Sequence, residues 1–328
     1  MIFRISLRTL PTLLALAASL GASAQSTGSN AVPAAPAPQS IATPAAPPAA
    51  PAFPQQDPRN FTAATPTRDT VEAFLRQTWG YDADRVWQVQ AIQKTSAPGV
   101  SKVTVMVAQK SNPQQTGSLV FWTTPDGNNL IANDVLPFGA HPFDTRRQLL
   151  QAAATGPARG AKTKTMLLVE FADFECPHCK EVQPTIAKLL LDFPQARFVY
   201  ENFPLVSIHS EAYKASAYSV CVAKLNGNEA FFRFSDALFA DQAQLTPEAS
   251  TQALKDAATK AGADPSKVAA CSTSPEAKTA VDGSVKLAQD LDINETPYLF
   301  VNGRGIPIGG LAYEQLKQIV AYQFSQDK

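Results

Sequence analysis

The stretch TMLLVEFADFECPHCKEVQP, residues 165–184, decides the fold. Its first seven residues form a short apolar run of the length of a strand. From Pro177 onward, apolar residues recur at helical spacing on one face: Val182, Ile186, Leu189 and Phe193. The stretch therefore predicts a strand followed by a helix, with Cys176 and Cys179 at the first turn of that helix.

Two thiols separated by two residues can store and release one disulfide. At a helix N-terminus, unpaired backbone N–H groups and the positive end of the dipole favour a thiolate on Cys176. Pro177 suits the first turn, and a protonated His178 places a second positive charge beside the sulfur. Glu175 acts in the opposite direction because a carboxylate opposes the thiolate. We predict that Cys176 attacks and that the more buried Cys179 resolves.

Two other interpretations of the cysteine pair are weaker. A zinc site needs two further ligands at a suitable spacing. The other cysteines are Cys221 and Cys271, and the other histidines, His141 and His209, are isolated in the sequence. A purely structural disulfide is disfavoured because so short a ring removes little entropy from the unfolded chain. We therefore expect a redox centre that holds no metal and needs no cofactor.

The N-terminus indicates export. Arg4 and Arg8 precede an apolar run over residues 10–20, and the small residues 22–24 follow it. This pattern predicts a signal peptide over residues 1–24. A membrane anchor is disfavoured because the run is short for a span and contains Pro11. Export implies a compartment in which disulfides persist, which we take to be the bacterial periplasm.

The charge is balanced, with 28 basic and 28 acidic residues, and no charge run suggests nucleic acid. After the signal peptide, residues 25–60 form a Pro/Ala-rich linker that cannot bury a core. Residues 67–78 are typical of an amphipathic helix, and Val103, Val105 and Val107 then alternate at strand spacing. We predict a small α+β domain with an antiparallel sheet over residues 61–143, and a linker helix within residues 144–163.

The second domain is predicted over residues 164–328. Residues 197–201 form a strand after the cysteine helix, which makes a βαβ unit with parallel strands. A helix-rich insertion occupies about residues 207–290. A hairpin turning at Asn302-Gly303 and a terminal helix then complete a thioredoxin-like sandwich, of class α/β.

This second domain resembles the DsbA-like branch of the thioredoxin superfamily. The matching features are Glu170-Phe171 at the strand end, the CPHC motif, Pro184, and Thr296-Pro297 before the hairpin. The resemblance implies that Pro297 is cis and faces the cysteines, and that Thr296 lines the substrate site. It also implies that Glu170 is a buried acid that helps to move protons, and that the chain is oxidising.

Cys221 and Cys271 lie in the helical insertion, and each lacks a near cysteine. In an exported protein their pairing as a structural disulfide is the simplest interpretation, and some DsbA-like proteins carry a second disulfide. Two free, buried cysteines are the alternative.

The smaller domain resembles the N-terminal dimerisation domain of bacterial disulfide isomerases of the DsbC and DsbG type. This likeness rests on the helix, Pro98-Gly99-Val100 and Asp126-Gly127 with the residues after it. It implies a homodimer that works as an isomerase or reductase, whereas Pro-His between the cysteines is the oxidase dipeptide in that superfamily.

We expect a periplasmic oxidase whose partners are exported unfolded or reduced proteins and an inner-membrane redox partner. The dimeric isomerase or reductase is the first alternative. A thioredoxin-fold protein that binds metal or acts as a chaperone is the alternative from another class.

Overall fold

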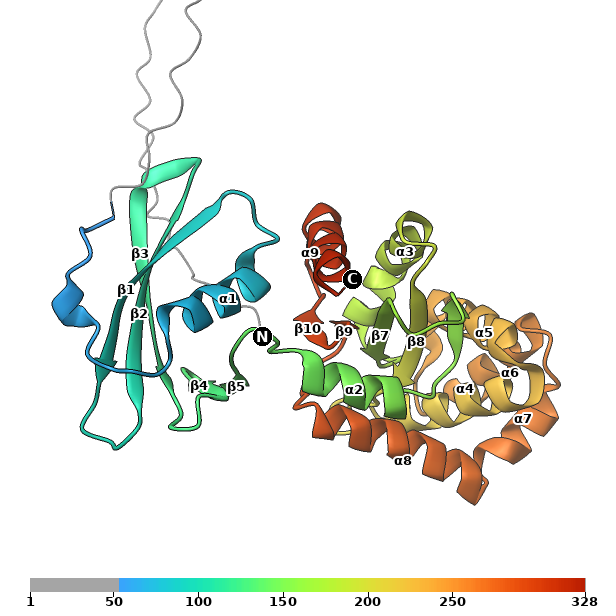
Figure 1. Cartoon of the computed structure of the whole chain (residues 1–328). Coiled ribbons are helices and arrows are strands. Elements are labelled where there is room, and N and C mark those ends of the chain that lie inside the picture. The colour runs from blue at the N-terminus through green and yellow to red at the C-terminus, as the bar shows by residue number, and fades with distance from the viewer. Residues whose placement is uncertain (1–52, 328) are drawn as a thin grey trace, which may run out of the picture.

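The computed structural model of the chain describes residues 53–327. The predicted signal peptide and most of the predicted Pro/Ala-rich linker lie outside these residues. The described part contains two five-stranded sheets, one in an N-terminal unit and one in a C-terminal unit (Figure 1). The first sheet is antiparallel and the second is mixed, which confirms the predicted fold class. No helix within residues 53–327 is both long and apolar enough to cross a membrane.

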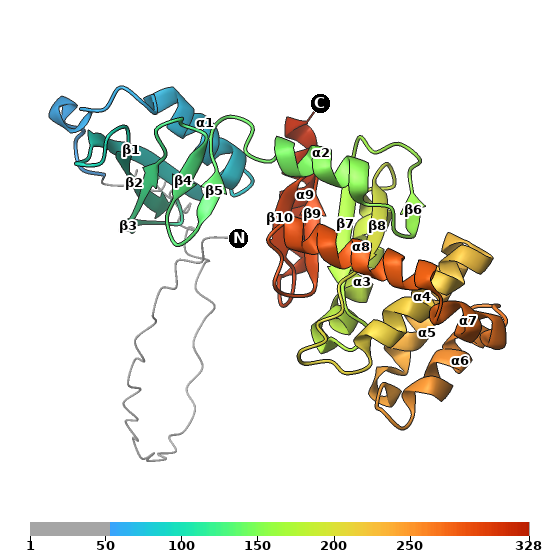
Figure 2. The ribbon, with the colours of Figure 1, turned by 90° about the horizontal axis from the view of Figure 1, so that it is seen from below.

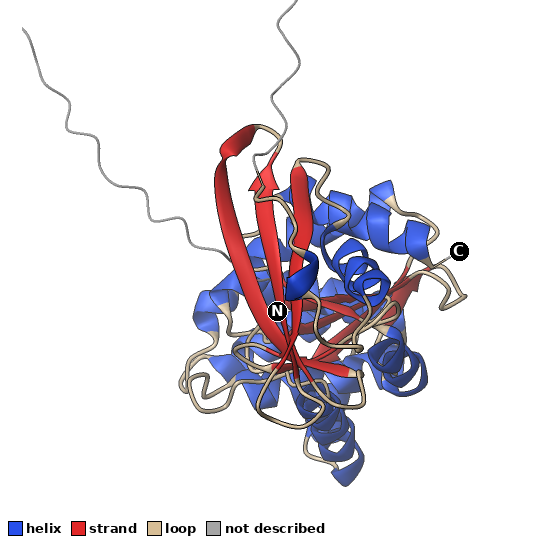
Figure 3. Cartoon of the chain, turned by 60° about the vertical axis from the view of Figure 1, so that its left-hand side comes forward, coloured by secondary structure: helices blue, strands red, loops and turns tan. Residues whose placement is uncertain are grey.

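The N-terminal unit, residues 53–137, packs a helix on its sheet (Figure 1), and the long strands of this sheet lie in the foreground of Figure 3. Its elements are α1 (Arg68–Trp79), β1 (Arg85–Lys94), β2 (Ser101–Gln109), β3 (Asn112–Thr123), β4 (Asn129–Ile131) and β5 (Val135–Pro137). Val103 and Val105 are fully buried and pack in one cluster with Leu75 of α1. The apolar residues that alternate along the sequence of β2 therefore lie on the face of the strand that packs against α1.

Ordered packing begins before residue 61, where the predicted linker ends. The Gln88 side-chain amide donates to the Pro54 carbonyl at 2.9 Å, and the Gln56 amide donates to the Val89 carbonyl at 2.7 Å. A 3₁₀ turn, η1 (Pro58–Asn60), follows. These polar contacts hold the end of the segment beside β1, and they were not visible in its Pro/Ala-rich composition.

The C-terminal unit contains a sheet of strand order β10-β9-β7-β8-β6. Its strands are β6 (Ala158–Gly160), β7 (Leu167–Ala172), β8 (Arg197–Asn202), β9 (Tyr298–Val301) and β10 (Arg304–Pro307). β7 and β8 are parallel and are connected by α3 (Pro177–Asp192), as the predicted βαβ unit requires. The predicted hairpin joins β9 to β10, with positive φ at Asn302 and Gly303.

Helices cover both faces of this sheet (Figure 2). α3 and α9 (Tyr313–Gln326) bury apolar residues in a cluster with Leu168 and Phe198 of the sheet. On the other face, α2 (Asp144–Ala153) and α8 (Pro275–Asp290) pack with Val169 and Phe171. The helix predicted as a linker is therefore α2, which contributes the fully buried Leu150 to this core.

The helical insertion lies between β8 and β9. It consists of α4 (Ala212–Asn226), α5 (Asn228–Ala240), η2 (Gln242–Gln244), α6 (Ser250–Lys260), α7 (Pro265–Ser272) and α8. A disulfide between Cys221 and Cys271 joins α4 to α7, with a Cα–Cα distance of 5.8 Å. The two cysteines that the sequence leaves without near partners are thus paired with each other.

The segment that we predicted as the linker, residues 144–163, also contains a strand of the second sheet, β6. β6 pairs antiparallel with β8, so this sheet begins before residue 164. A Cβ on Gly156 would lie 1.9 Å from the Tyr200 carbonyl oxygen. Glycine is needed here because the two backbones lie so close, rather than because the segment is a flexible linker.

Candidate active site

Cys176 and Cys179 lie at the start of α3, where the sequence predicted them. Cys176 is the N-cap residue and Pro177 is the first residue of the helix. Cys176 is 5 % exposed and Cys179 is fully buried, and both are free thiols. The tight turn before the helix closes with a hydrogen bond from the Cys176 amide to the Asp173 carbonyl at 3.1 Å. Cys176 therefore keeps a small exposed area, whereas Cys179, one turn further in, has none.

The two thiols differ strongly in acidity. A hydrogen bond from the Cys179 thiol lowers the pKa of Cys176 to about 5, and burial opposes this effect. The Thr296 side chain and the backbone N–H groups of Cys179 and His178 lower it further. Burial, followed by the neighbouring Cys176, raises the pKa of Cys179 well above its ordinary value. At neutral pH the negative charge therefore resides on Cys176.

Thr296 and Pro297 lie directly beside the reactive sulfur. The Cys176 sulfur is 3.5 Å from the Thr296 carbonyl oxygen, and the Thr296–Pro297 peptide bond is cis, as expected. Pro297 is buried, while Thr296 is half-buried. The reactive sulfur and the cis bond are therefore direct neighbours.

Glu170 lies on β7 and is completely buried. Burial raises its pKa to about 7, although a hydrogen bond from Gln183 to the Glu170 Oε1 atom at 3.3 Å opposes the shift. The same Gln183 amide donates to the Cys179 carbonyl oxygen at 2.9 Å. Gln183 thus joins the acid to the helix turn that carries the resolving thiol, a contact that the sequence analysis missed.

His178 and Glu175 lie on either side of Cys176 in the sequence. The His178 ring is largely exposed and lies 2.9 Å from Glu181, which raises the pKa of His178. The Glu175 carboxylate accepts a hydrogen bond from the Glu211 backbone N–H at 2.6 Å, and burial raises its pKa. Glu175 is therefore engaged at the start of α4, and its opposing effect on the Cys176 thiolate stays a prediction.

A hydrogen-bonded pair that the sequence analysis missed involves Asp173, three residues before Cys176. The His209 Nδ1 atom is 2.8 Å from the Asp173 Oδ2 atom, and Asp173 is completely buried. The same carboxylate accepts backbone N–H groups from Glu175 and Leu205, each at 2.8 Å. We treated His209 as isolated because it is 36 residues from Asp173. Only the folded chain brings the two together.

The arrangement suits thiol chemistry, because Gln183 joins a buried acid to the helix turn that carries the resolving thiol, and the acidic thiol lies at the start of the same turn. Within residues 53–327, no three His, Cys, Asp or Glu side chains are grouped so that they could hold a metal ion.

Curated relatives match part of the chain. A Na⁺/H⁺ antiporter NhaA from Salinispora tropica is 31 % identical over 152 residues, which are 44 % of this chain and 21 % of the antiporter. A second NhaA antiporter, from Salinispora arenicola, is 31 % identical over 153 residues, with the same two coverages. The chain thus spans about a fifth of the length of these relatives.

Solved structures are also similar. A periplasmic thioredoxin-like protein from Salmonella enterica serovar Typhimurium is 20 % identical, with a TM-score of 0.47 over 56 % of this chain and 97 % of that one. The thiol-disulfide exchange protein α-DsbA2 from Wolbachia pipientis is 20 % identical, with a TM-score of 0.48 over 55 % of this chain and 94 % of that one.

A family model described as thioredoxin matches residues 152–321, which is more than half of the chain. The match extends from the end of α2 into α9 and includes both cysteines of the motif and the Thr296–Pro297 bond. The chain therefore belongs to the thioredoxin family.

Proposed function

We propose that this protein is a periplasmic thiol–disulfide oxidoreductase that oxidises exported polypeptides. The observation that carries the proposal is the Cys176 thiolate, whose pKa is about 5, beside the cis Thr296–Pro297 bond. Its partner Cys179 is buried and has a raised pKa. One cysteine is thereby suited to receive and release substrate, and the other is suited to close the ring.

The reaction begins with a disulfide between Cys176 and Cys179. A substrate thiolate attacks the Cys176 sulfur, the enzyme disulfide breaks, and its electron pair leaves on Cys179, which takes up a proton. A second substrate thiolate then attacks the substrate sulfur of the mixed disulfide, and Cys176 leaves as the thiolate. The substrate gains a disulfide, and the enzyme holds the two electrons as a dithiol.

Glu170 and Gln183 support the protonation of Cys179. With a pKa of about 7, the buried acid carries a proton in part of the molecules at neutral pH. Gln183 contacts both this acid and the Cys179 carbonyl oxygen. We assign Glu170 to the proton exchange that accompanies opening and closing of the ring.

The low pKa of Cys176 favours the oxidase direction, because a stabilised thiolate in the reduced form makes the disulfide a stronger oxidant. The exchange needs no cofactor, but turnover needs an electron acceptor, which we propose is an inner-membrane redox partner. Export is supported by the predicted signal peptide and by the Cys221–Cys271 disulfide. The exported protein should begin at Gln25 when its N-terminus is sequenced.

Cys176→Ala should abolish oxidation of a reduced peptide with two cysteines. The matched control is the double variant Cys221→Ala and Cys271→Ala, which removes the other disulfide and should retain oxidation. Full activity of Cys176→Ala would overturn the proposal. Equilibration with glutathione buffers should give a potential above about −180 mV, and a value near −270 mV would instead favour a reductase.

A dimeric isomerase is the second candidate, and one observation favours it. Trp122, Ile131 and Val135 face one another across β3, β4 and β5, and they are 39, 37 and 57 % exposed. An exposed apolar row of this kind is typical of a protein interface, so it supports a homodimer through the N-terminal unit. Sedimentation should then give a dimer that Ile131→Lys dissociates, and a monomeric wild type would exclude this candidate.

A further inference from the structure

A cleft of about 490 Å³ lies between the N-terminal unit and the loops around the cis Thr296–Pro297 bond. Ligand sites commonly have volumes of about 300 to 1,000 Å³. The residues that matter most in its lining are Asp134, Leu136, Arg146, Asp292, Glu295 and Gly309. Asp134 and Leu136 come from the β4–β5 segment, whereas the others belong to the C-terminal unit.

The cleft reaches the cysteine motif through Gly309. A Cβ placed on Gly309 would lie 3.7 Å from the Pro297 Cδ atom and 3.8 Å from the His178 Cβ atom. Gly309 thus lies against both the cis proline and the CPHC helix, and it also lines the cleft. A polypeptide whose cysteine reacts at Cys176 can therefore continue past Pro297 into the cleft.

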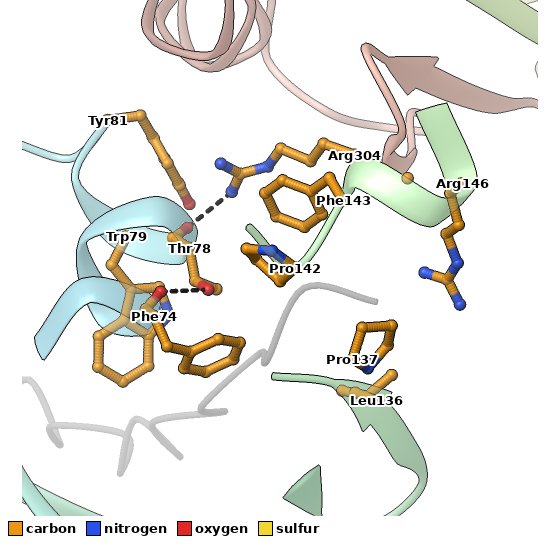
Figure 4. Close-up of a pocket in the computed structure, with 11 residues that line it drawn as sticks. Phe74, Thr78, Trp79, Tyr81, Leu136, Pro137, Pro142, Phe143, Arg146 and Arg304 are labelled. Atoms are coloured by element: carbon orange, nitrogen blue, oxygen red, sulfur yellow. Dashed lines mark hydrogen bonds between the residues drawn. The ribbon is translucent and has the colours of Figure 1, made fainter. Parts of the chain in front are cut away.

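Arg304, which lies outside the lining of this cleft, joins the C-terminal unit to the end of α1 in the N-terminal unit. Its buried guanidinium donates to the Gln77 carbonyl oxygen at 3.2 Å and to the Thr78 carbonyl oxygen at 2.7 Å, both at the end of α1. Figure 4 draws the hydrogen bond to Thr78. The guanidinium also lies over the Tyr81 ring, 4.9 Å from its centroid, and the Tyr322 hydroxyl donates to the Arg76 carbonyl at 2.8 Å. A cation and a hydroxyl of the C-terminal unit thus cap the negative end of α1.

The charges on the cleft do not balance. The Arg146 guanidinium lies 3.8 Å from the Asp292 carboxylate, so the one basic residue of the lining is paired with one of its acidic residues. Asp134 and Glu295 have no cationic group within ion-pair distance anywhere in residues 53–327. Among the described residues, the Asp134 carboxylate accepts a hydrogen bond only from the neighbouring Val135 N–H, at 2.7 Å. Two uncompensated carboxylates, one from each unit, therefore line the same cleft.

We infer that this cleft binds a basic segment of the substrate polypeptide and that Asp134 and Glu295 select Lys or Arg near the reacting cysteine. The inference rests on the proposed thiol–disulfide exchange and adds a class of substrate to it. Complementary charge raises the rate of encounter and excludes like-charged partners. Because Asp134 belongs to the N-terminal unit, this unit takes part in the selection of the substrate.

The test uses the oxidised full chain and three peptides of equal length. Each peptide has one cysteine flanked on both sides by two Lys, two Gln or two Glu residues. For each peptide we measure the rate of mixed-disulfide formation at Cys176 and the rate at which the same peptide reacts with dipyridyl disulfide, which is uncharged. The first rate divided by the second no longer depends on the intrinsic reactivity of the peptide thiol. The normalised Lys-to-Glu ratio should be about five to ten in the wild type at low salt. It should approach one at about 1 M salt.

The double variant Asp134→Asn and Glu295→Gln should lower this ratio to about two or less. The matched control is Glu229→Gln with Asp256→Asn, which removes the same charge from the exposed faces of α5 and α6 and should retain the wild-type ratio. The single variant Asp134→Asn changes a residue far in sequence from the reactive loop. It should lower the normalised Lys-to-Glu ratio, but less than the double variant does. It also provides the measurement if the double variant fails to fold.

The outcomes separate the two proposals. Equal rates of the three peptides with the wild type would overturn the cleft inference and leave the proposed exchange intact. An unchanged ratio in Asp134→Asn would overturn the part assigned to the N-terminal unit. If the wild type reacts neither with any peptide nor with dithiothreitol, the proposed function itself is overturned.

Discussion

The Cys176 sulfur lies 3.5 Å from the carbonyl oxygen of Thr296, although the two residues are 120 positions apart in the chain. The contact joins the start of α3 to the turn before β9. It places the reactive sulfur beside the Thr296–Pro297 bond, along which we propose that the substrate backbone lies. The thiol and this proposed binding surface come from two distant segments of the chain.

Alkylation of Cys176 should report its low pKa directly. The thiolate is the reactive form, so the rate of reaction with iodoacetamide should be half-maximal near pH 5 and constant above neutral pH. The reduced protein is alkylated over a range of pH, and the product is measured by mass spectrometry. Cys176→Ser should lose the reaction at low pH. A half-maximal rate near pH 9, the ordinary value for a thiol, would contradict the prediction.

Glu170 should make the stability of the protein depend on pH. Its pKa is about 7 in the folded protein and 4.5 when unperturbed, so the folded state binds more protons between these values. The free energy of unfolding therefore falls as the pH rises through this window, and the loss is nearly complete above pH 7. Glu170→Gln removes the charge and should be more stable than the wild type at pH 8, by up to about 3 kcal/mol.

Urea unfolding of Glu170→Gln and the wild type at several pH values measures this difference. The two proteins should converge below about pH 4.5, where the wild-type acid is protonated in both states. Glu314→Gln on the exposed face of α9 is the control and should follow the wild type at every pH. A stability difference that does not change with pH would contradict the assignment.

His209→Ala should destabilise the protein because it removes a partner of the buried Asp173 carboxylate. A hydrogen bond to a charged group contributes about 1.5 to 3 kcal/mol, so the free energy of unfolding should fall by about that amount. Chemical denaturation measures the change. His141→Ala is the control, since its side chain is 77 % exposed, and it should have almost no effect. Equal stabilities of the two variants would show that the pair contributes little.

Arg304→Met should release the N-terminal unit from the C-terminal sheet. The variant loses both hydrogen bonds to the end of α1, so proteolytic cleavage of the connection over residues 138–143 should become at least about tenfold faster. Limited proteolysis followed by mass spectrometry locates the cut. Arg233→Met is the matched control because Arg233 also donates to a helix-end carbonyl, that of Ala261, but within the insertion. If Arg304→Met were cleaved at the wild-type rate, Arg304 would not be the residue that holds the N-terminal unit against the C-terminal unit.

Much of the fold could be predicted because it depends on local patterns. The alternation of Val103, Val105 and Val107 identifies β2, and Asn302-Gly303 identifies the turn between β9 and β10. β6 was not predictable, because three residues carry no detectable period and its pairing with β8 depends on a partner about 40 residues away. The packing of α2 on the second sheet was hidden for the same reason.

The sequence by itself determined the two cysteines, their place at a helix start and the order of their acidity, because these follow from residue types and spacing within one turn. Tertiary structure alone decided that Asp173 meets His209, that Gln183 joins Glu170 to Cys179, and that Arg304 caps α1. It also decided that Asp134 and Glu295 line one cleft. Such contacts join residues that are far apart in the chain, and only the packing of helices against the two sheets brings them within reach.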